Sequence, residues 1–192
     1  MKIAIIFDNR RRPDTTGIYC LRALQKNHEV IHYLPEDLGK IRAEQYEAFI
    51  NIDDGFNYRF PKNLHPSIFW AIDTHVKPER CLERARDFDL VFCAQRPGAE
   101  EMRKAGISAR WCPLACDPEI HKKHSLPKLF DISFVGNFGR FRYGRFFWEG
   151  KRIFRERARL ISLLKKKFNL FIGNYFHETI QKTKFSYTMS PR

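Results

Sequence analysis

Acidic side chains stand directly after three short apolar runs in the first half of the sequence. Asp8 follows KIAIIF, Asp53 and Asp54 follow YEAFINI, and Asp73 and His75 follow SIFWAI. In an open parallel sheet, the carboxyl ends of the strands line the binding crevice. A carboxylate or an imidazole placed there is suited to general-base work or to holding hydroxyl groups. Asp73 and His75 are therefore the candidate catalytic residues.

A structural role is the alternative for these side chains, because NIDDG and DNRRRPD are also favourable turn sequences. The turn interpretation is stronger for Asp53 and Asp54 than for Asp73 and His75. The sequence leaves both roles open.

Two later apolar segments, SFVGN and LFIGN, each end in Gly-Asn. A glycine after a strand lets the backbone approach a phosphate closely. Together with the basic loop that contains Arg140, Gly136 and Asn137 predict a cradle for a diphosphate. The sequence has neither the GxGxxG fingerprint nor a Walker motif, so we expect no bound cofactor.

The segment RWCPLACDPEIH combines Cys112, Cys116 and His121, and His124 lies just beyond it. Structural zinc sites usually have tighter spacings of two residues between paired cysteines. Cys112 also falls inside an expected strand. We therefore expect no metal site and no redox pair here, and we interpret the segment as a crossover between two domains. The five cysteines are scattered and odd in number, which favours reduced thiols.

Strand-like and helix-like segments alternate along the first half of the chain. This alternation predicts an α/β domain with a Rossmann-like parallel sheet over residues 1–115. The strands are rich in Ile, Val and Phe without strict alternation, as expected where both faces of a sheet are buried. The expected strands are 2–7, 29–34, 46–52, 67–73, 89–95 and 109–114, and the expected helices are 17–27, 78–88 and 97–106.

The pattern stops after Pro113, and residues 116–128 are interpreted as an interdomain linker because they are polar and aperiodic. It then restarts with a strand over 129–137, a helix of about five turns, a strand over 168–174 and a helix that begins at HETIQKTKF. Two such units cannot bury a doubly wound sheet by themselves. We therefore expect residues 129–192 to be the truncated start of a second Rossmann-like domain.

The basic residues are concentrated in one segment. The chain has 192 residues and a formal net charge of +13, and eleven Lys or Arg but only two Glu lie between Arg140 and Lys167. Such a local field attracts anions such as nucleotide phosphates or nucleic acid, although a solvated helix face is the alternative. Aromatic side chains in the same segment would suit stacking on bases, but no RRM, KH or zinc-finger pattern accompanies them.

No apolar run approaches the ~20 residues that a membrane-spanning helix needs. The apolar segment at the N-terminus is also too short for a secretory signal. A soluble cytoplasmic protein is the expectation.

Several strings fit together as one family pattern. KIAIIFDNRRRPDTTGIYCLRAL, AIDTHV, DLVFCAQRPGAEEMRKAGI, ARWCPLACDPEIH and DISFVGN occur in this order. They resemble the CgeB family of spore-maturation, glycosyltransferase-like proteins, and the resemblance covers residue 2 to about 187. It implies a GT-B architecture, in which the first Rossmann-like domain binds the acceptor and the second binds a nucleotide-sugar. Enzymes of this type generally need no metal, because basic residues and helix N-termini stabilise the leaving diphosphate.

The resemblance also implies roles for individual residues. Gly136 and Asn137 would lie near the donor diphosphate, and Arg140 would add positive charge. Thr16 and Gly17 would face the cleft from the other side.

The same resemblance makes Asp73 or His75 the base that activates the acceptor. The donor site is expected to be incomplete within these 192 residues. The sugar, the nucleotide, the acceptor and the stereochemical course stay open. The alternative function is a basic module that binds nucleic acid or another polyanion.

Overall fold

The chain forms two compact units, Met1–Lys122 and Lys123–Arg192, in the computed structural model. The boundary between the units falls within the segment interpreted as a linker. The structure describes residues 1–10, 15–119, 122, 127, 129–135, 148–173 and 186–187.

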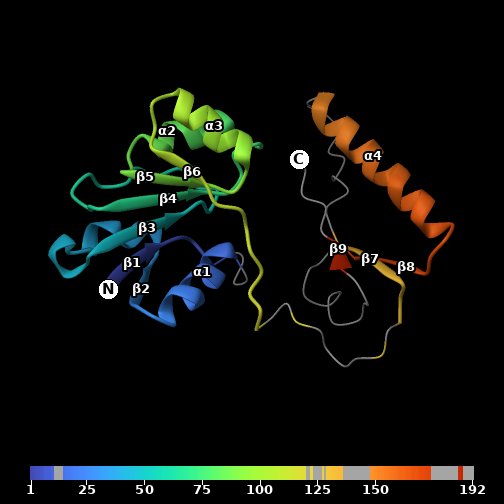
Figure 1. The fold of residues 1–192 in the computed structure, drawn as a ribbon, viewed down its shortest axis with the longest axis horizontal. Coiled ribbons are helices and arrows are strands. Elements are labelled where there is room, and N and C mark those ends of the chain that lie inside the picture. Colours follow the sequence, from blue (N-terminus) through green and yellow to red (C-terminus); the bar gives the residue numbers. More distant parts are fainter. Residues whose placement is uncertain are drawn as a thin grey trace. The chain divides into compact units, whose positions relative to one another are not determined.

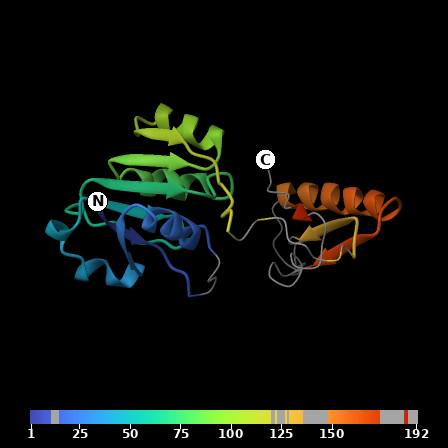
Figure 2. The same ribbon diagram turned by 60° about the horizontal axis from the view of Figure 1, so that its bottom comes forward.

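The first unit is built on a six-stranded sheet in which all neighbouring strands are parallel (Figures 1 and 2). The strand order is β2-β1-β3-β4-β5-β6. This arrangement confirms the expected α/β class with a Rossmann-like parallel sheet. The strands are β1 (Lys2–Ile6), β2 (Glu29–Tyr33), β3 (Ala48–Ile52), β4 (Ser67–Ala71), β5 (Leu90–Cys93) and β6 (Ala109–Trp111). The helices are α1 (Thr16–Gln25), α2 (Pro78–Ala85) and α3 (Arg96–Lys104), with short 3-10 helices η1 (Pro35–Lys40) and η2 (Ala43–Gln45).

Successive residues of β1 enter two different cores, because side chains alternate across a strand. Ile3 and Ile5 are buried in a cluster that also receives Leu21 of α1. Ala4 and Ile6 are buried in a second cluster with residues of η1 and of the segment after β3. The chain therefore leaves β1 toward α1 on one face of the sheet and leaves β3 on the opposite face.

Aromatic rings extend the second core toward the far edge of the sheet. Phe88 stacks on Phe69 of β4 with 5.1 Å between ring centroids, and it packs on Phe60 at 4.5 Å. Phe69 is fully buried in the cluster formed with α2 and α3. These two helices lie over the β5 and β6 end, whereas α1 lies beside β1 and β2 (Figure 1). Helices on both faces exclude water from the strands and make them a rigid support for the loops at their ends.

Several strands end earlier than their apolar pattern predicts. β4 ends at Ala71, because the chain then turns so that the amides of Val76 and Lys77 donate to the carbonyl oxygen of Asp73. β6 ends at Trp111, shortly before Pro113, which has no amide to continue a ladder. The two 3-10 helices had no sequence signal, since their short turns lack a helical period. The shortened β4 leaves Asp73 in a loop.

The second unit holds a three-stranded parallel sheet in the order β8 (Leu170–Gly173), β7 (Ile132–Val135) and β9 (Ser186–Tyr187). The ring of Phe130 packs on Phe171 with 4.9 Å between centroids, and Ile161 of the helix is buried. The expected helix at HETIQKTKF lies outside the described residues, and the strand β9 was not predicted. That this unit begins a second Rossmann-like domain stays a prediction. Its elements are β7 (Ile132–Val135), α4 (Trp148–Lys165), β8 (Leu170–Gly173) and β9 (Ser186–Tyr187).

A carboxylate joins the amino ends of β4 and β5. One oxygen of Asp89 accepts hydrogen bonds from the amide of Ser67 at 2.7 Å and from its hydroxyl at 2.8 Å, and it contacts Nδ1 of His65 at 2.9 Å. These contacts hold the pKa of Asp89 down, at about 2, with the His65 contact as the largest cause. Because the folded-state pKa is depressed, this stabilisation is present above the ordinary pKa of Asp and is lost as the pH falls toward 2.

Asp89→Asn should therefore lower the free energy of unfolding at pH 7 by roughly 1 kcal/mol, a modest figure because the carboxylate is half exposed to solvent. The difference from the unmodified chain should disappear between about pH 4 and pH 2. Urea denaturation at several pH values measures this difference. A deficit that stays constant down to pH 2 would contradict the assigned role.

Candidate functional site

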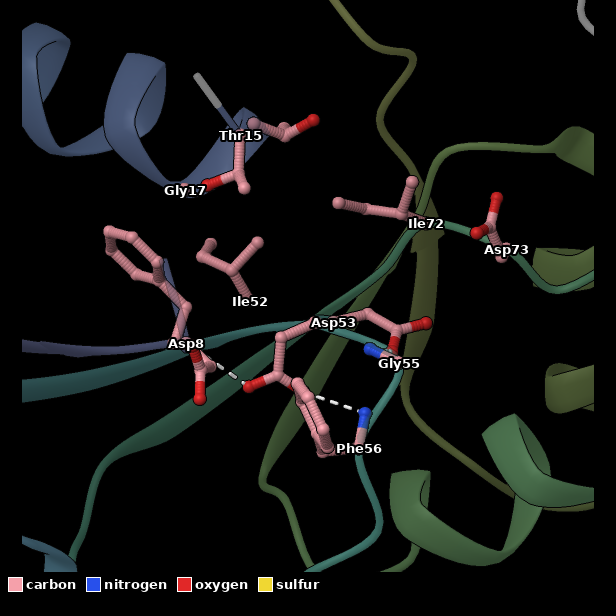
Figure 3. Close-up of a pocket in the computed structure, with 12 residues that line it drawn as sticks. Asp8, Thr15, Gly17, Ile52, Asp53, Gly55, Phe56, Ile72 and Asp73 are labelled. Atoms are coloured by element: carbon pink, nitrogen blue, oxygen red, sulfur yellow. Dashed lines mark hydrogen bonds between the residues drawn. The ribbon is translucent and has the colours of Figure 1, made fainter. Parts of the chain in front are cut away.

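A cavity of about 380 Å³ opens at the carboxyl end of the sheet in the first unit. It lies where β1 and β3 are neighbours and their connections leave on opposite faces, which is the usual ligand position in doubly wound sheets. Its size falls within the range of small-molecule sites. The lining residues are Phe7, Asp8, Thr15, Thr16, Gly17, Ile52, Asp53, Asp54, Gly55, Phe56, Ile72 and Asp73 (Figure 3).

The amino end of α1 forms one wall of the cavity (Figure 3). Thr15 is the N-cap residue, and its carbonyl oxygen accepts a hydrogen bond from the amide of Ile18 at 3.0 Å. Its side chain makes no capping hydrogen bond, and Oγ1 is buried without a partner among the described residues. The first amides of a helix lack partners inside it and carry partial positive charge. This wall therefore offers hydrogen-bond donors to a ligand.

Gly17 brings this helix close to the end of β1. A Cβ atom at Gly17 would lie 2.5 Å from the ring of Phe7, closer than atoms can approach. The ring of Phe7 cannot retreat easily, because it stacks on His32 with 4.1 Å between centroids. Gly17, predicted as a binding residue, thus also has a packing role that brings the amino end of α1 to the cavity.

Two arginines of α2 hold the carboxylates at the end of β3. Arg80 donates to both oxygens of Asp53, at 2.8 and 3.1 Å. Arg84 lies 3.8 Å from Asp53 and 3.9 Å from Asp54, and it donates to the side-chain oxygen of Asn51 at 2.7 Å. The side chains of Arg84, Asp53 and Asp54 are only 4%, 2% and 3% exposed. A buried charge needs a partner of this kind, so these ion pairs are required for the loop to stay folded.

The hydrogen bonds of Asp54 connect neighbouring strand ends. It accepts from the amides of Asp8 and Phe56, both at 3.1 Å, and from the hydroxyl of Tyr58 at 3.0 Å. Burial raises the pKa of Asp54, while these donors and Arg84 oppose the rise. Burial likewise raises the pKa of Tyr58. Asp54 is therefore occupied in holding the end of β1 against the end of β3.

The carboxylate of Asp8 also has hydrogen-bond partners. It accepts hydrogen bonds from the backbone amide and the guanidinium of Arg10, which in turn pairs with Glu36. The Asp8 side chain is 5% exposed, whereas Arg10 is 55% exposed. The turn role weighed for the acidic residues thus describes Asp8, Asp53 and Asp54 well.

Asp73 differs from these three carboxylates. It is exposed, it lines the cavity, and its carboxylate has no ion pair or hydrogen bond with another described residue. His75 follows in the same turn and is exposed, but it does not line the cavity. The structure therefore brings the predicted residues Thr16, Gly17 and Asp73 to one cavity and leaves His75 outside it.

The predicted diphosphate residues Gly136, Asn137 and Arg140 lie outside the described residues. Sequence reasoning did not predict Arg80 and Arg84, which hold the acidic loop. Their spacing of four on an expected helix places them on one face, and this was the available signal.

Cys112 and Cys116 lie in the described part of the cysteine segment. In the part of the chain that the structure describes, no group of three or more His, Cys, Asp or Glu is placed to hold a metal ion. The carbonyl oxygen of Cys112 accepts a hydrogen bond from Nε1 of Trp70 at 3.2 Å, and Cys116 is exposed. His121 and His124 lie outside the described residues.

Comparisons with known proteins do not assign the chain to a family. A scan against protein-family models gives no match, and no curated protein matches the sequence. Among the helices that the structure describes, none has the length and apolar character to cross a membrane.

Gly17→Ala should lower the free energy of unfolding by about 1–3 kcal/mol, because the added methyl group clashes with Phe7. Gly39→Ala is the matched control, since a Cβ atom there meets no atom within 4 Å, and it should change stability by less than about 0.5 kcal/mol. Chemical denaturation measures both changes. Equal stability of the two variants would show that α1 does not pack as described.

Arg84→Met should lower the free energy of unfolding by about 3–5 kcal/mol, because buried Asp54 loses the cation 3.9 Å away and the side-chain oxygen of Asn51 loses its donor. Asp53 keeps its ion pair with Arg80 in this variant. Arg86→Met at the C-cap of the same helix is the control, because the side chain of Arg86 is exposed, and it should be nearly neutral. Thermal and urea unfolding measure the difference. A loss below about 1 kcal/mol for Arg84→Met would rule out its role as the required counter-charge of Asp54.

Proposed function

We propose that this chain is a glycosyltransferase-like protein of GT-B type, in which the first unit binds the acceptor. The observation that carries the proposal is Asp73, whose carboxylate lines a cavity of hydrogen-bonding groups and has no ion pair or hydrogen bond with another described residue. The cavity stands at the crevice where parallel α/β sheets bind small molecules. The strings that resemble the CgeB family support the same function.

The proposed chemistry is a direct transfer of the sugar. An acceptor hydroxyl loses its proton to the carboxylate of Asp73 while its oxygen attacks the anomeric carbon of a nucleotide-sugar. The new carbon–oxygen bond forms as the bond between that carbon and the diphosphate breaks, and the nucleoside diphosphate leaves with the electron pair. Asp53 and Asp54 are less suited to be the base, because arginines and amides already occupy their oxygens.

The donor side of the proposal depends on the basic segment of the second unit. Gly136, Asn137 and Arg140 are the residues proposed to bind the diphosphate, where positive charge and backbone amides would stabilise the leaving group. Positive charge at this position would perform the role that a metal ion has in other transferases.

Nucleotide binding tests the function directly. The protein would be heated with UDP, GDP, ADP or dTDP, and with their glucose or mannose conjugates, and its Tm would be recorded. One nucleoside diphosphate should stabilise the protein by about 2.7 kcal/mol at a hundredfold excess over its Kd. No protection by any nucleotide, combined with tight and steeply salt-dependent binding of single-stranded RNA or DNA, would support the polyanion-binding alternative instead.

Asp73→Asn should reduce the release of nucleoside diphosphate from the productive nucleotide-sugar by about 10²–10⁴-fold. His75→Asn is the matched control, since His75 lies in the same exposed turn but outside the cavity, and it should stay within about twofold of the unmodified rate. Neither change should alter the nucleotide-dependent rise in Tm. Loss of activity in His75→Asn with full activity in Asp73→Asn would transfer the base to His75.

A further inference from the structure

We infer that the cavity beside α1 selects a neutral, polyhydroxylated sugar over an anionic one. The inference rests on the proposed function, because it names the acceptor class for the same site. The cavity has two facing walls, one of which donates hydrogen bonds while the other accepts them.

The first wall, at the amino end of α1, donates hydrogen bonds. Thr16 and Gly17 line the cavity there, where helix amides lack intrahelical partners. The hydroxyl oxygen of Thr15 is closed off from solvent, so we assign the donors of this wall to the backbone amides of Thr16 and Gly17.

The second wall accepts hydrogen bonds. Asp53 and Asp73 lie across the cavity from the amino end of α1 (Figure 3). Both oxygens of Asp53 accept hydrogen bonds from Arg80. Asp73 is therefore the carboxylate best placed to accept a proton or a hydrogen bond from a ligand.

A hydroxyl group satisfies both walls, because its oxygen accepts from amides while its proton is donated to a carboxylate. A phosphate or carboxylate would satisfy the helix terminus, but it would meet Asp73 as a like charge. An ammonium group would suit Asp73, but it would meet the positive end of the α1 dipole. A sugar ring carries several hydroxyl groups, so it can form hydrogen bonds with both walls at once.

Apolar side chains complete the match to a sugar ring. Phe56 is 38% exposed at the cavity, and Ile52 and Ile72 line it between the two walls (Figure 3). The carbon–hydrogen faces of a sugar are apolar, and they pack on such surfaces while the hydroxyls reach the walls. A cavity of about 380 Å³ limits the bound part of the acceptor to a small unit.

The test compares neutral sugars with their own uronic acids on the intact 192-residue protein. Glucose and glucuronate, galactose and galacturonate, and mannose and mannuronate form three pairs that differ by one charge. Titration followed by ligand-detected NMR at pH 7 gives the Kd of each. At least one neutral sugar should bind about tenfold or more tightly than its uronate, because like charges repel in the cavity.

Variants identify the two walls. Asp73→Asn should reduce the difference between the neutral sugar and its uronate to less than about threefold, because it removes the repelling charge. Thr16→Pro should weaken binding of the neutral sugar by about five- to tenfold, because it removes the amide of Thr16, and proline is tolerated at the first position of a helix. Glu83→Gln removes one exposed negative charge from α2, outside the cavity lining, and should leave the difference intact.

The outcomes separate this inference from the proposed function. Uronates that bind as tightly as the neutral sugars, or a panel in which no sugar binds although a nucleotide protects the protein, would overturn the inference and leave the function standing. A preference for neutral sugars that depends on Asp73 and on the amide of Thr16 supports the inference, even if no nucleotide raises the Tm and the transferase proposal fails.

Discussion

The buried contact between Arg84 and the carboxylates after β3 is the constraint on which the site depends. Arg84 lies within 4 Å of both Asp53 and Asp54, and its guanidinium stands 4.5 Å from the ring of Tyr58 and 4.9 Å from that of Phe69. Two adjacent carboxylates could not stay buried and ionised without a counter-charge. The contact therefore connects α2 to the carboxyl end of the sheet and fixes the position of Asp53 and Asp54, which line the cavity.

The cavity follows from the topology that this contact stabilises. The chain leaves β1 and β3 on opposite faces of the sheet, so the loops diverge and leave space between them. The absence of a side chain at Gly17 lets α1 approach Phe7, which brings helix amides to that space. Carboxylates on one side and amides on the other make the cavity suited to hydroxyl groups, and this property links the fold to the proposed transfer of a sugar.

Most of the first sheet could be predicted because a parallel strand is buried on both faces. Short apolar runs such as KIAII and AFINI are typical of buried parallel strands, and their alternation with amphipathic helices indicates the fold class. Strand ends were less predictable, because local turns decide them. A turn in which two amides donate to the backbone carbonyl oxygen of Asp73 ends β4 two residues earlier than expected. The 3-10 helices were missed since they have too few residues to show a period.

The sequence by itself determined the fold class of the first unit and placed acidic residues after its strands, because hydrophobic periodicity is a local property of the chain. Only the tertiary structure decided what each acid does. Asp53 and Asp54 form ion pairs with arginines some thirty residues away and become structural, whereas Asp73 lines the cavity and has no ion pair with another residue that the structure describes. Side chains of the same chemical type thus acquire different roles, because burial and partners depend on contacts between segments that are distant in the chain.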